Sequence, residues 1–286
     1  MNLYKSIILL LFLIQGILFS QIHSEKFNKD SCETDFVHNI KHDFNSFINV
    51  GVDYFVSPFH FDKEDFLISG LIVGGTAFSF ALDNRVREAS QRTRSKTMNG
   101  ITSFAKNFGE PVYGTALSAV LYVGGHISSN KYIRETGVML FEAMVLNGFV
   151  TGSLKTILGR SRPYTNERNT EFHFFNFKFD NNYQSLPSGH TSTAFTIATV
   201  LSERIDNIYA SILLYTGAGM TAYERIYDNK HWFSDTVLGA AIGTVTGLAV
   251  VRLYTKASEK KDNCKQLIIL PTIGKEVYGL NLSLRF

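Results

Sequence analysis

The chain of 286 residues has only two cysteines, little net charge and no repeated unit. These absences exclude some kinds of binding site and some classes of protein. Neither cysteine belongs to a Cys-x-x-Cys motif or a Cys/His cluster, so no zinc site is expected. A formal net charge of +3 is too balanced for a nucleic-acid-binding protein, which would carry a strongly basic face. The length suits one domain with a full core, and a second domain is not needed.

The first twenty residues have the pattern of a secretory signal peptide. Lys5 gives the positive start, residues 7–19 the apolar centre and Ser20 a cleavage point. An uncleaved membrane anchor is the alternative. In both cases we expect the polar stretch 21–64 to be exported to the cell envelope. There Cys32 and Cys264 either pair and tie the two ends together or stay separate thiols.

Six apolar stretches without Lys or Arg dominate the middle of the chain, and their length and composition predict helices. They are residues 66–82, 111–130, 137–154, 191–202, 207–223 and 236–251. Small residues allow such helices to pack closely, as we expect at Gly70 and Gly74. The more polar stretch 85–107 predicts one additional amphipathic helix on the surface.

The C-terminal tail has a different character from the helical region. Residues 267–270 and 280–286 predict two strands around a turn at Gly274-Lys275, forming a hairpin docked on the bundle. The predicted organisation therefore has four parts. They are a signal peptide (1–20), an exported N-terminal segment (21–64), a helical domain (65–256) and the tail (257–286).

Three short residue groups follow one another along the chain and together supply what a phosphate pocket needs. They are Lys155 with Arg162, then Ser188, Gly189 and His190, then Arg225, His231 and Asp235. Three cations, a hydroxyl, a glycine amide, two imidazoles and a carboxylate can hold a tetrahedral oxyanion and transfer its phosphoryl group without a metal. Each group alone is weak evidence for a phosphate pocket, whereas the three groups in this order are strong evidence.

The first group lies where Gly159 and Pro163 are expected to end a helix. Arg162 offers a planar fork of donors for phosphate oxygens, and Lys155 offers a compact charge. Taken alone, the two residues would be solvated cations that favour the negative end of a helix.

The second group directly precedes a helix expected to start near Thr191. Free amides at a helix N-terminus point at an anion, and Gly189 lets the backbone come close. Ser188 either donates its hydroxyl to the anion or only caps the helix. His190 is placed to protonate a leaving oxygen.

In the third group, His231 and Asp235 are four residues apart and would share one face of a helix. A carboxylate on one ring nitrogen fixes the tautomer and frees the other nitrogen to attack phosphorus. The Asp228-Asn229 turn can bring Arg225 over the same pocket. An ordinary surface pair is the alternative for His231 and Asp235.

The pattern KxxxxxxRP, then PSGH, then RxxxxxHxxxD resembles the type 2 phosphatidic acid phosphatase and vanadium haloperoxidase superfamily, over residues 155–235. The resemblance implies an all-α fold, here a six-helix bundle with the short C-terminal β-hairpin. It also implies hydrolysis of a phosphomonoester or pyrophosphate, which we expect to be that of a lipid, through a phosphohistidine. One departure is Glu224, where many members have Ser. An acid there either repels substrate or orients a neighbouring cation.

In the mechanism that the resemblance implies, His231 attacks the phosphate while Asp235 orients its ring. His190 first protonates the departing alcohol and then activates water. The equatorial oxygens are held by the remaining five residues, Lys155, Arg162, Ser188, Gly189 and Arg225. We expect no metal and no cofactor, and therefore activity in the presence of a chelator.

The loop 164–186 between the first two groups carries an aromatic run, Phe172 to Phe179. Such rings beside a phosphate pocket either enter a lipid interface, hold an acyl chain, or pack on the bundle itself. The expected partners are a phosphorylated lipid or other small phosphoester and the membrane, and no nucleic acid.

The side of the membrane that the pocket faces is ambiguous from the sequence. Several apolar stretches just reach the length of about 17 residues needed to cross a bilayer. If every stretch spans and residues 21–64 are exported, three crossings precede Lys155 and the pocket is cytoplasmic. The resemblance implies the opposite, a periplasmic active site. Integral and peripheral association both remain open.

Two other functions compete with a phosphatase. The same pocket holds vanadate in a haloperoxidase, although the signal peptide and apolar helices favour the phosphatase. A catalytically inactive envelope protein that uses the bundle for binding is the second alternative, and Glu224 is its one support.

Overall fold

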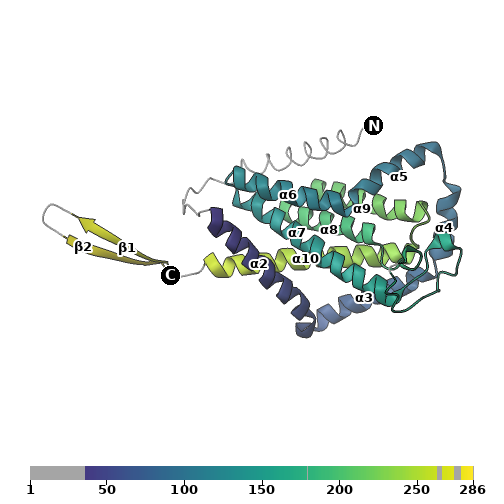
Figure 1. Cartoon of the computed structure of the whole chain (residues 1–286), viewed down its shortest axis with the longest axis horizontal. Helices are drawn as coiled ribbons and strands as arrows, with labels where there is room; N and C mark the ends of the chain where they lie inside the picture. The colour runs from purple at the N-terminus through teal and green to yellow at the C-terminus, as the bar shows by residue number, and fades with distance from the viewer. Residues whose placement is uncertain (1–35, 179, 263–265, 274–277, 286) are drawn as a thin grey trace.

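The computed structural model describes residues 36–178, 180–262, 266–273 and 278–285, and most of the described chain before residue 263 is helical (Figure 1). The helices are α2 (Phe36–Val56), α3 (Lys63–Phe80), α4 (Asp83–Arg92), α5 (Lys96–Phe108), α6 (Pro111–Ile127), α7 (Lys131–Leu158), α8 (Gly189–Ile205), α9 (Ile208–Tyr227) and α10 (Phe233–Asp262). Short 3-10 turns occupy Ser57–His60, Pro163–Thr165 and Asn181–Tyr183. The all-α prediction agrees with this architecture.

The predicted count of six helices is too low for the described residues. The six apolar stretches correspond to α3 and to α6 through α10, and three further helices accompany them. The stretch 85–107 forms two helices rather than one, because Ser95 accepts from the Met98 amide at 3.1 Å and caps a new start at α5. Helix α2 lies in the N-terminal segment, where the sequence analysis expected no helix.

Helix α8 lies at the centre of the bundle and packs against α7, α9 and α10. Its buried residues include many small and hydroxyl-bearing ones, such as Ala194, Ala198 and Thr196, beside larger aliphatic residues such as Ile197 and Leu201. The small residues let neighbouring helices come close enough for backbone contact. The centre of the bundle therefore combines close helix contacts with a core of larger apolar side chains.

A glycine seam on α10, formed by Gly239, Gly243 and Gly247, faces α8. A Cβ on Gly239 would lie 2.6 Å from the Ser188 carbonyl oxygen, and one on Gly243 would lie 2.2 Å from that of Ser192. Larger residues would therefore push the two helices apart. The predicted close contact at Gly70 and Gly74 is wrong, because nothing lies within 4 Å of a Cβ built on either residue.

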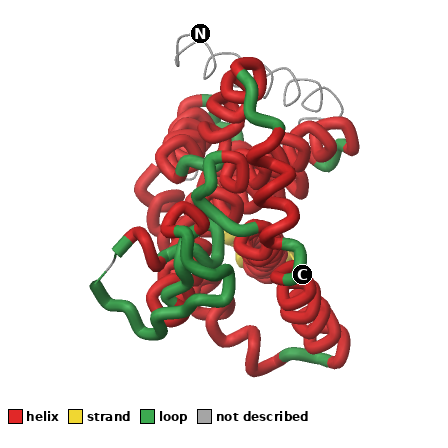
Figure 2. The backbone as a smooth tube through the Cα atoms, turned by 90° about the vertical axis from the view of Figure 1, so that its right-hand side faces the viewer, coloured by secondary structure: helices red, strands yellow, loops and turns green. Residues whose placement is uncertain are grey.

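Helix α7 ends where the sequence predicted. Gly159 adopts the left-handed conformation at φ 58°, and its amide donates to the Lys155 carbonyl oxygen at 2.9 Å. A Cβ at this position would lie 1.9 Å from the His173 carbonyl oxygen, so the turn requires glycine. The chain then enters the long loop 159–188, the green tube with a grey gap at residue 179 in Figure 2.

Two strands follow the bundle. Strand β1 (Gln266–Ile273) pairs antiparallel with β2 (Tyr278–Arg285), with Gln266 opposite Arg285. The predicted turn at Gly274-Lys275 lies outside the described residues, so a hairpin docked on the bundle stays a prediction. The predicted signal peptide, residues 1–20, and both cysteines lie outside them as well.

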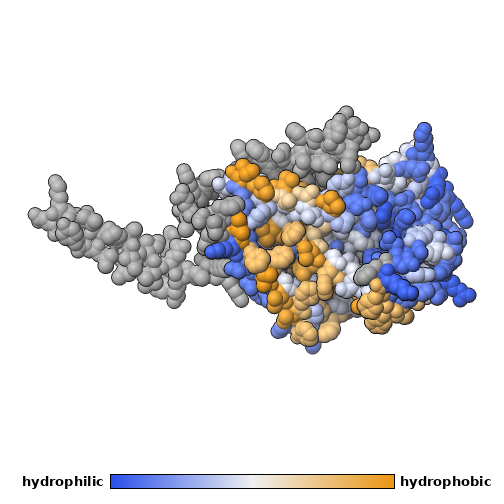
Figure 3. All heavy atoms as spheres, in the orientation of Figure 1, coloured by the Kyte–Doolittle hydropathy of each residue, from blue (hydrophilic) through white to orange (hydrophobic). Residues whose placement is uncertain are grey.

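The bundle has membrane-like helices and a polar end. In the described chain, α7 and residues Phe233–Ser258 of α10 are long and apolar enough to cross a bilayer. The pair α3 and α4, bent by 60°, passes the same test if counted as one broken span. Figure 3 shows apolar residues over much of the body and hydrophilic residues at the end that carries α4 and α5. These features support association with a membrane.

Candidate active site

The three predicted residue groups meet at one end of the bundle. Helix α7 ends there, α8 begins there, and the turn between α9 and α10 lies between them. The Ser188 amide donates to the Asp235 carbonyl oxygen at 2.9 Å, which ties the start of α8 to the start of α10. The glycine seam holds the same two helices together, so the site is built on the most tightly packed pair.

Lys155 and Arg162 converge on a single oxygen atom. The Lys155 Nζ donates to the Gln184 carbonyl oxygen at 2.7 Å, and the Arg162 Nη2 donates to it at 3.3 Å. A Cβ on Gly189 would lie 3.7 Å from the Lys155 Cε, so the start of α8 is beside the same cation. Two positive side chains thus already coordinate an oxygen atom at the edge of the site.

The second group starts α8, two residues earlier than predicted. Ser188 is its N-cap, and the Ser188 Oγ accepts from the Thr191 amide at 3.4 Å and from the Thr191 hydroxyl at 2.9 Å. The capping explanation therefore describes its present contacts, while its own hydrogen remains a donor. Gly189 and His190 occupy the first turn of α8, where free amides favour an anion.

His231 faces Asp235, but the two residues do not share a helix as predicted. His231 lies in the turn before α10, and Asp235 lies in its first turn. The His231 Nδ1 is 3.4 Å from the Asp235 Oδ2, and both side chains are buried. The pairing leaves the Nε2 as the ring nitrogen not directed at the carboxylate. The His231 amide also donates to the Arg225 carbonyl oxygen at 3.1 Å, which ties this turn to α9.

Asp235 is held by a buried network that the sequence analysis missed. Arg160 donates to the Asp235 Oδ1 at 2.5 Å and to the Asp83 Oδ2 at 2.6 Å. Ser185 and the Trp232 amide donate to the other Asp235 oxygen at 2.5 and 2.8 Å. Arg160, Asp83 and Asp235 are each 0% exposed. One cation between two carboxylates thus fixes the aspartate that faces His231.

Glu224 contacts the neighbouring cation. Both of its oxygens accept from the Arg225 guanidinium, and both side chains are buried. Of the two effects expected for an acid at this position, orientation of a cation is the one that the contacts match. This planar fork also means that Arg225 is already paired inside the protein.

His190 has a carboxylate partner that the sequence analysis missed. The His190 Nε2 lies 3.1 Å from the Glu110 Oε1, and the two side chains are 28% and 30% exposed. Glu110 precedes α6, and the adjacent Gly109 has no room for a side chain, since a Cβ would lie 2.6 Å from the His190 carbonyl oxygen. The α5–α6 turn therefore closes directly over the second histidine.

Burial is the main cause that lowers the pKa of both histidines. Burial lowers the pKa of His231 to about 3, and the Lys155 and Arg162 charges act in the same direction against the opposing effect of Asp235. Burial and then Arg225 lower the pKa of His190, while Glu110 opposes the shift. His231 is therefore neutral at physiological pH, as a nitrogen nucleophile must be.

Within the described residues, no three His, Cys, Asp or Glu side chains gather in a way that would hold a metal ion.

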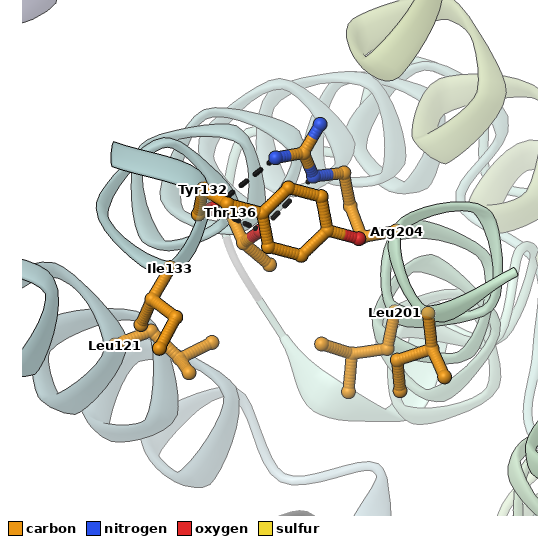
Figure 4. A pocket seen from close by; sticks show the side chains of 7 residues that line it. Leu121, Tyr132, Ile133, Thr136, Leu201 and Arg204 are labelled. Atoms are coloured by element: carbon orange, nitrogen blue, oxygen red, sulfur yellow. Dashed lines mark hydrogen bonds between the residues drawn. The ribbon is translucent and has the colours of Figure 1, made fainter. Parts of the chain in front are cut away.

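A separate small hollow lies between α6, α7 and α8, where Arg204 stacks over the Tyr132 ring at 3.9 Å and donates to Thr136 at 3.0 Å (Figure 4). Arg204 follows His190 by about 20 Å along α8. This hollow is at the other end of the bundle from the candidate site.

Comparison with known proteins agrees with the geometry. Residues 136–259 match the family model of the PAP2 superfamily, and this range contains every predicted site residue. A relative named lipid A 1-phosphatase from Porphyromonas gingivalis is 29% identical over 62% of the chain and 36% of its own length. One of the same name from Rhizobium etli is 24% identical over 65% of the chain and 83% of its own length.

A solved structure, described as the crystal structure of Aquifex aeolicus LpxE, has a TM-score of 0.47 and 24% identity over 60% of this chain and 95% of that chain. The chain spans about a third of the length of the Porphyromonas gingivalis relative. The family resemblance inferred from the three motifs is confirmed by the match to residues 136–259.

Proposed function

We propose that this chain, which belongs to the PAP2 superfamily, hydrolyses a phosphomonoester or pyrophosphate of a lipid through a phosphohistidine intermediate. The observation that carries the proposal is the convergence of Lys155, Arg162 and the start of α8 beside the buried His231–Asp235 pair. The apolar helices α7 and α10 support a membrane setting, where a lipid substrate is available.

In the first step, the Nε2 of neutral His231 attacks phosphorus and forms a P–N bond. The bond between phosphorus and the ester oxygen breaks, and His190 gives its proton to the departing alkoxide. Asp235 holds the Nδ1–H and stabilises the positive charge that develops on the ring. The tight hold of Arg160 on Asp235 favours this orientation.

In the second step, His190, now neutral, takes a proton from water as the water oxygen attacks phosphorus. The P–N bond breaks, and inorganic phosphate and the free imidazole are released. Because Glu110 is directed at the His190 ring, it supports the protonated state needed for the next turnover.

The cationic side chains and helix amides stabilise the three equatorial oxygens of the transferring group. Lys155 and Arg162 would exchange the Gln184 carbonyl oxygen for phosphate oxygens, and the Gly189 amide and Ser188 hydroxyl would donate from the start of α8. Positioning and charge stabilisation then supply most of the rate acceleration.

We propose that this charge is sufficient without a metal ion. Purified protein should keep its activity in EDTA, with magnesium addition as the comparison. Loss of turnover in EDTA that magnesium restores would contradict metal independence.

The names of the relatives make the 1-phosphate of lipid A the first substrate to test. Phosphate release should be measured across lipid A 1-phosphate, other lipid phosphates, a lipid pyrophosphate and a soluble aryl phosphate, with His231→Ala beside the parent. Equal rates in parent and variant would remove His231 as the nucleophile. Bromide oxidation that depends on added vanadate would favour the haloperoxidase instead.

We also propose that the pocket opens on the periplasmic side of the envelope. A cysteine introduced at exposed Lys178, in the loop beside the pocket, should react in intact cells with a maleimide that does not cross the inner membrane. Both native cysteines should be replaced first. Reaction only after permeabilisation would place the pocket on the cytoplasmic side, as the count of three crossings requires.

A further inference from the structure

The loop that carries Arg162 also exposes three phenylalanine rings to the surface. Phe174, Phe175 and Phe177 are 62%, 63% and 69% exposed. We therefore reject the idea that this part of the loop packs on the bundle. Among the phenylalanines described in this run, Phe172 has that role, since its ring centroid lies 6.3 Å from that of Phe80 and 5.6 Å from that of Phe174. We call residues 172–177 the aromatic loop.

The aromatic loop is fixed in place by the end of α7. Three amides donate to backbone carbonyl oxygens at 2.9 Å: His173 to Gly159, Phe175 to Ile157 and Asn176 to Thr156. The last carbonyl groups of a helix have no partner inside the helix, and the loop supplies one for two of them. The exposed rings are thus presented by an anchored backbone.

The backbone at Phe175 adds to the case that its ring has an external partner. Phe175 has φ 58°, the left-handed region that glycine and asparagine adopt easily and bulky residues rarely adopt. A large apolar side chain here is unfavourable for the backbone and is also exposed to solvent. An apolar environment outside the protein would compensate for both costs.

The position of the loop identifies that environment. It lies at the end of α7, one of the two helices of the described chain long and apolar enough to cross a bilayer on their own. Residues on the exposed side of α7 recur every four positions, with Phe141, Val145 and Phe149 at 43%, 43% and 61% exposed. Ile157, which receives the Phe175 amide, is 42% exposed. The aromatic loop continues this apolar surface at the C-terminal end of α7.

We propose that the aromatic loop inserts into the acyl-chain boundary of the bilayer that holds α7, and so places the adjacent pocket at the level of the lipid headgroups. The occupant of the exposed rings is bulk bilayer lipid. Lys178 and Arg168, which are both exposed on the longer loop 159–188, would lie beside headgroup phosphates. The proposal concerns membrane contact and does not depend on the phosphatase activity.

Tryptophan fluorescence tests the insertion directly. The chain has one tryptophan, Trp232, which is 1% exposed and serves as an internal reference. Phe175→Trp and Phe177→Trp should be reconstituted in vesicles of phosphatidylcholine brominated on the upper acyl chain. We expect strong quenching by the brominated lipid and little quenching by aqueous acrylamide. Arg92→Trp, at an 82% exposed side chain on polar α4, should show the reverse.

Three outcomes would overturn the proposal. Acrylamide quenching of both loop tryptophans without bromine quenching would place the loop in water. Quenching only when a brominated lipid phosphate is added to plain vesicles would assign the rings to the substrate acyl chain. Shielding from acrylamide without bromine quenching would indicate a second copy of the chain. Unchanged Trp232 emission and circular dichroism would show that the variants fold.

An activity comparison adds a second test, which rests on the proposed function. A triple variant should lower the turnover of a lipid phosphate in vesicles by about tenfold or more, because its three apolar rings are no longer buried in the bilayer. The variant is Phe174→Ser/Phe175→Ser/Phe177→Ser. Turnover of a soluble aryl phosphate should stay within about twofold of the parent, because the pocket is not altered. Equal losses on both substrates would contradict the anchoring role. If the parent hydrolyses neither substrate, the proposed function fails while the fluorescence result still decides the insertion.

Discussion

The two histidines of the candidate site each face a carboxylate, but their surroundings differ. His231 is buried against Asp235, which Arg160, Ser185 and a backbone amide hold from three directions. His190 faces Glu110 alone, and both of these side chains are partly open to solvent. The His231–Asp235 pair is buried at the start of α10, whereas the Glu110 carboxylate of the other pair reaches His190 from the turn before α6.

This difference matches two chemical tasks. A nucleophile must stay neutral and keep one nitrogen aimed at phosphorus, which burial and a fixed aspartate provide. A general acid and base must gain and lose a proton in each cycle, which contact with solvent allows. The predictions below test this division, beginning with the largest expected effect.

His231→Ala should cause the largest loss, on the order of 10⁴-fold or more in kcat, because the proposed covalent route disappears. Phosphate release by purified protein measures it. When the substrate carries a labelled phosphoryl group, the parent protein should retain a covalently bound label that is labile in acid and stable in base. The variant should retain none. If label appears in both proteins, another residue carries the phosphoryl group.

His190→Ala should cost on the order of 10²–10⁴-fold with an alkyl phosphate, because the leaving alkoxide then lacks a proton donor. With an aryl phosphate, whose leaving group is far less basic, the loss in the first step should be smaller. Burst kinetics with the aryl ester would show phosphohistidine forming and then persisting. An equal loss on both esters, without a burst, would argue against the acid role.

Arg160→Met should destabilise the protein by about 3–5 kcal/mol, because it leaves two buried carboxylates without their shared cation. Thermal unfolding in detergent measures the loss. Arg92→Met is the matched control, since that side chain is 82% exposed and its replacement should change stability little. Similar shifts for both variants would show that the Arg160 network contributes no more than a surface charge.

The lowered pKa of His231 should make stability depend on pH. Between about pH 6.5 and about pH 3 the unfolded chain binds a proton at this residue and the folded chain does not. The free energy of unfolding should therefore fall by about 1.4 kcal/mol per pH unit as the pH is lowered through this window. Above about pH 6.5, this residue should contribute no pH dependence. His231→Gln should flatten the slope, while His60→Gln, at an exposed position, should not.

Glu110→Gln should have the smallest effect, up to about fivefold in kcat/KM, since partly exposed ion pairs contribute little. Glu110 raises the pKa of His190 against burial and Arg225, so its loss should lower that pKa further. The alkaline limb of the pH–rate profile, where His190 must be protonated, should then move to lower pH. An unmoved limb with a uniformly lower rate would indicate only a structural role for Glu110.

Sequence reasoning found the residues that belong to the three motifs and missed the buried partners that hold them. The end of α7 at Gly159 and the capping role of Ser188 follow from short-range rules, and both appear in the structure. Asp83 precedes Asp235 by about 150 residues, and only the folded bundle shows that Arg160 joins them. Glu110 likewise has no local signal, because the residue that it faces lies on another helix.

Helix packing was the least predictable part of the fold. Composition alone correctly indicated close contacts between small residues, yet it selected Gly70 and Gly74, which face open space. The seam that does form uses Gly239 and Gly243, whose partners lie across from them on α8. Spacing identifies a face of a helix, but only the arrangement of neighbouring helices determines which face is covered.

The glycine seam between α8 and α10 limits which substitutions this chain can accept without loss of its site. Because the Ser188 amide donates to the Asp235 carbonyl oxygen across this contact, the distance between the two helices fixes the start of α8 relative to the carboxylate that faces His231. A single methyl group added at Gly239 or Gly243 would separate the two helices and so displace both halves of the site at once.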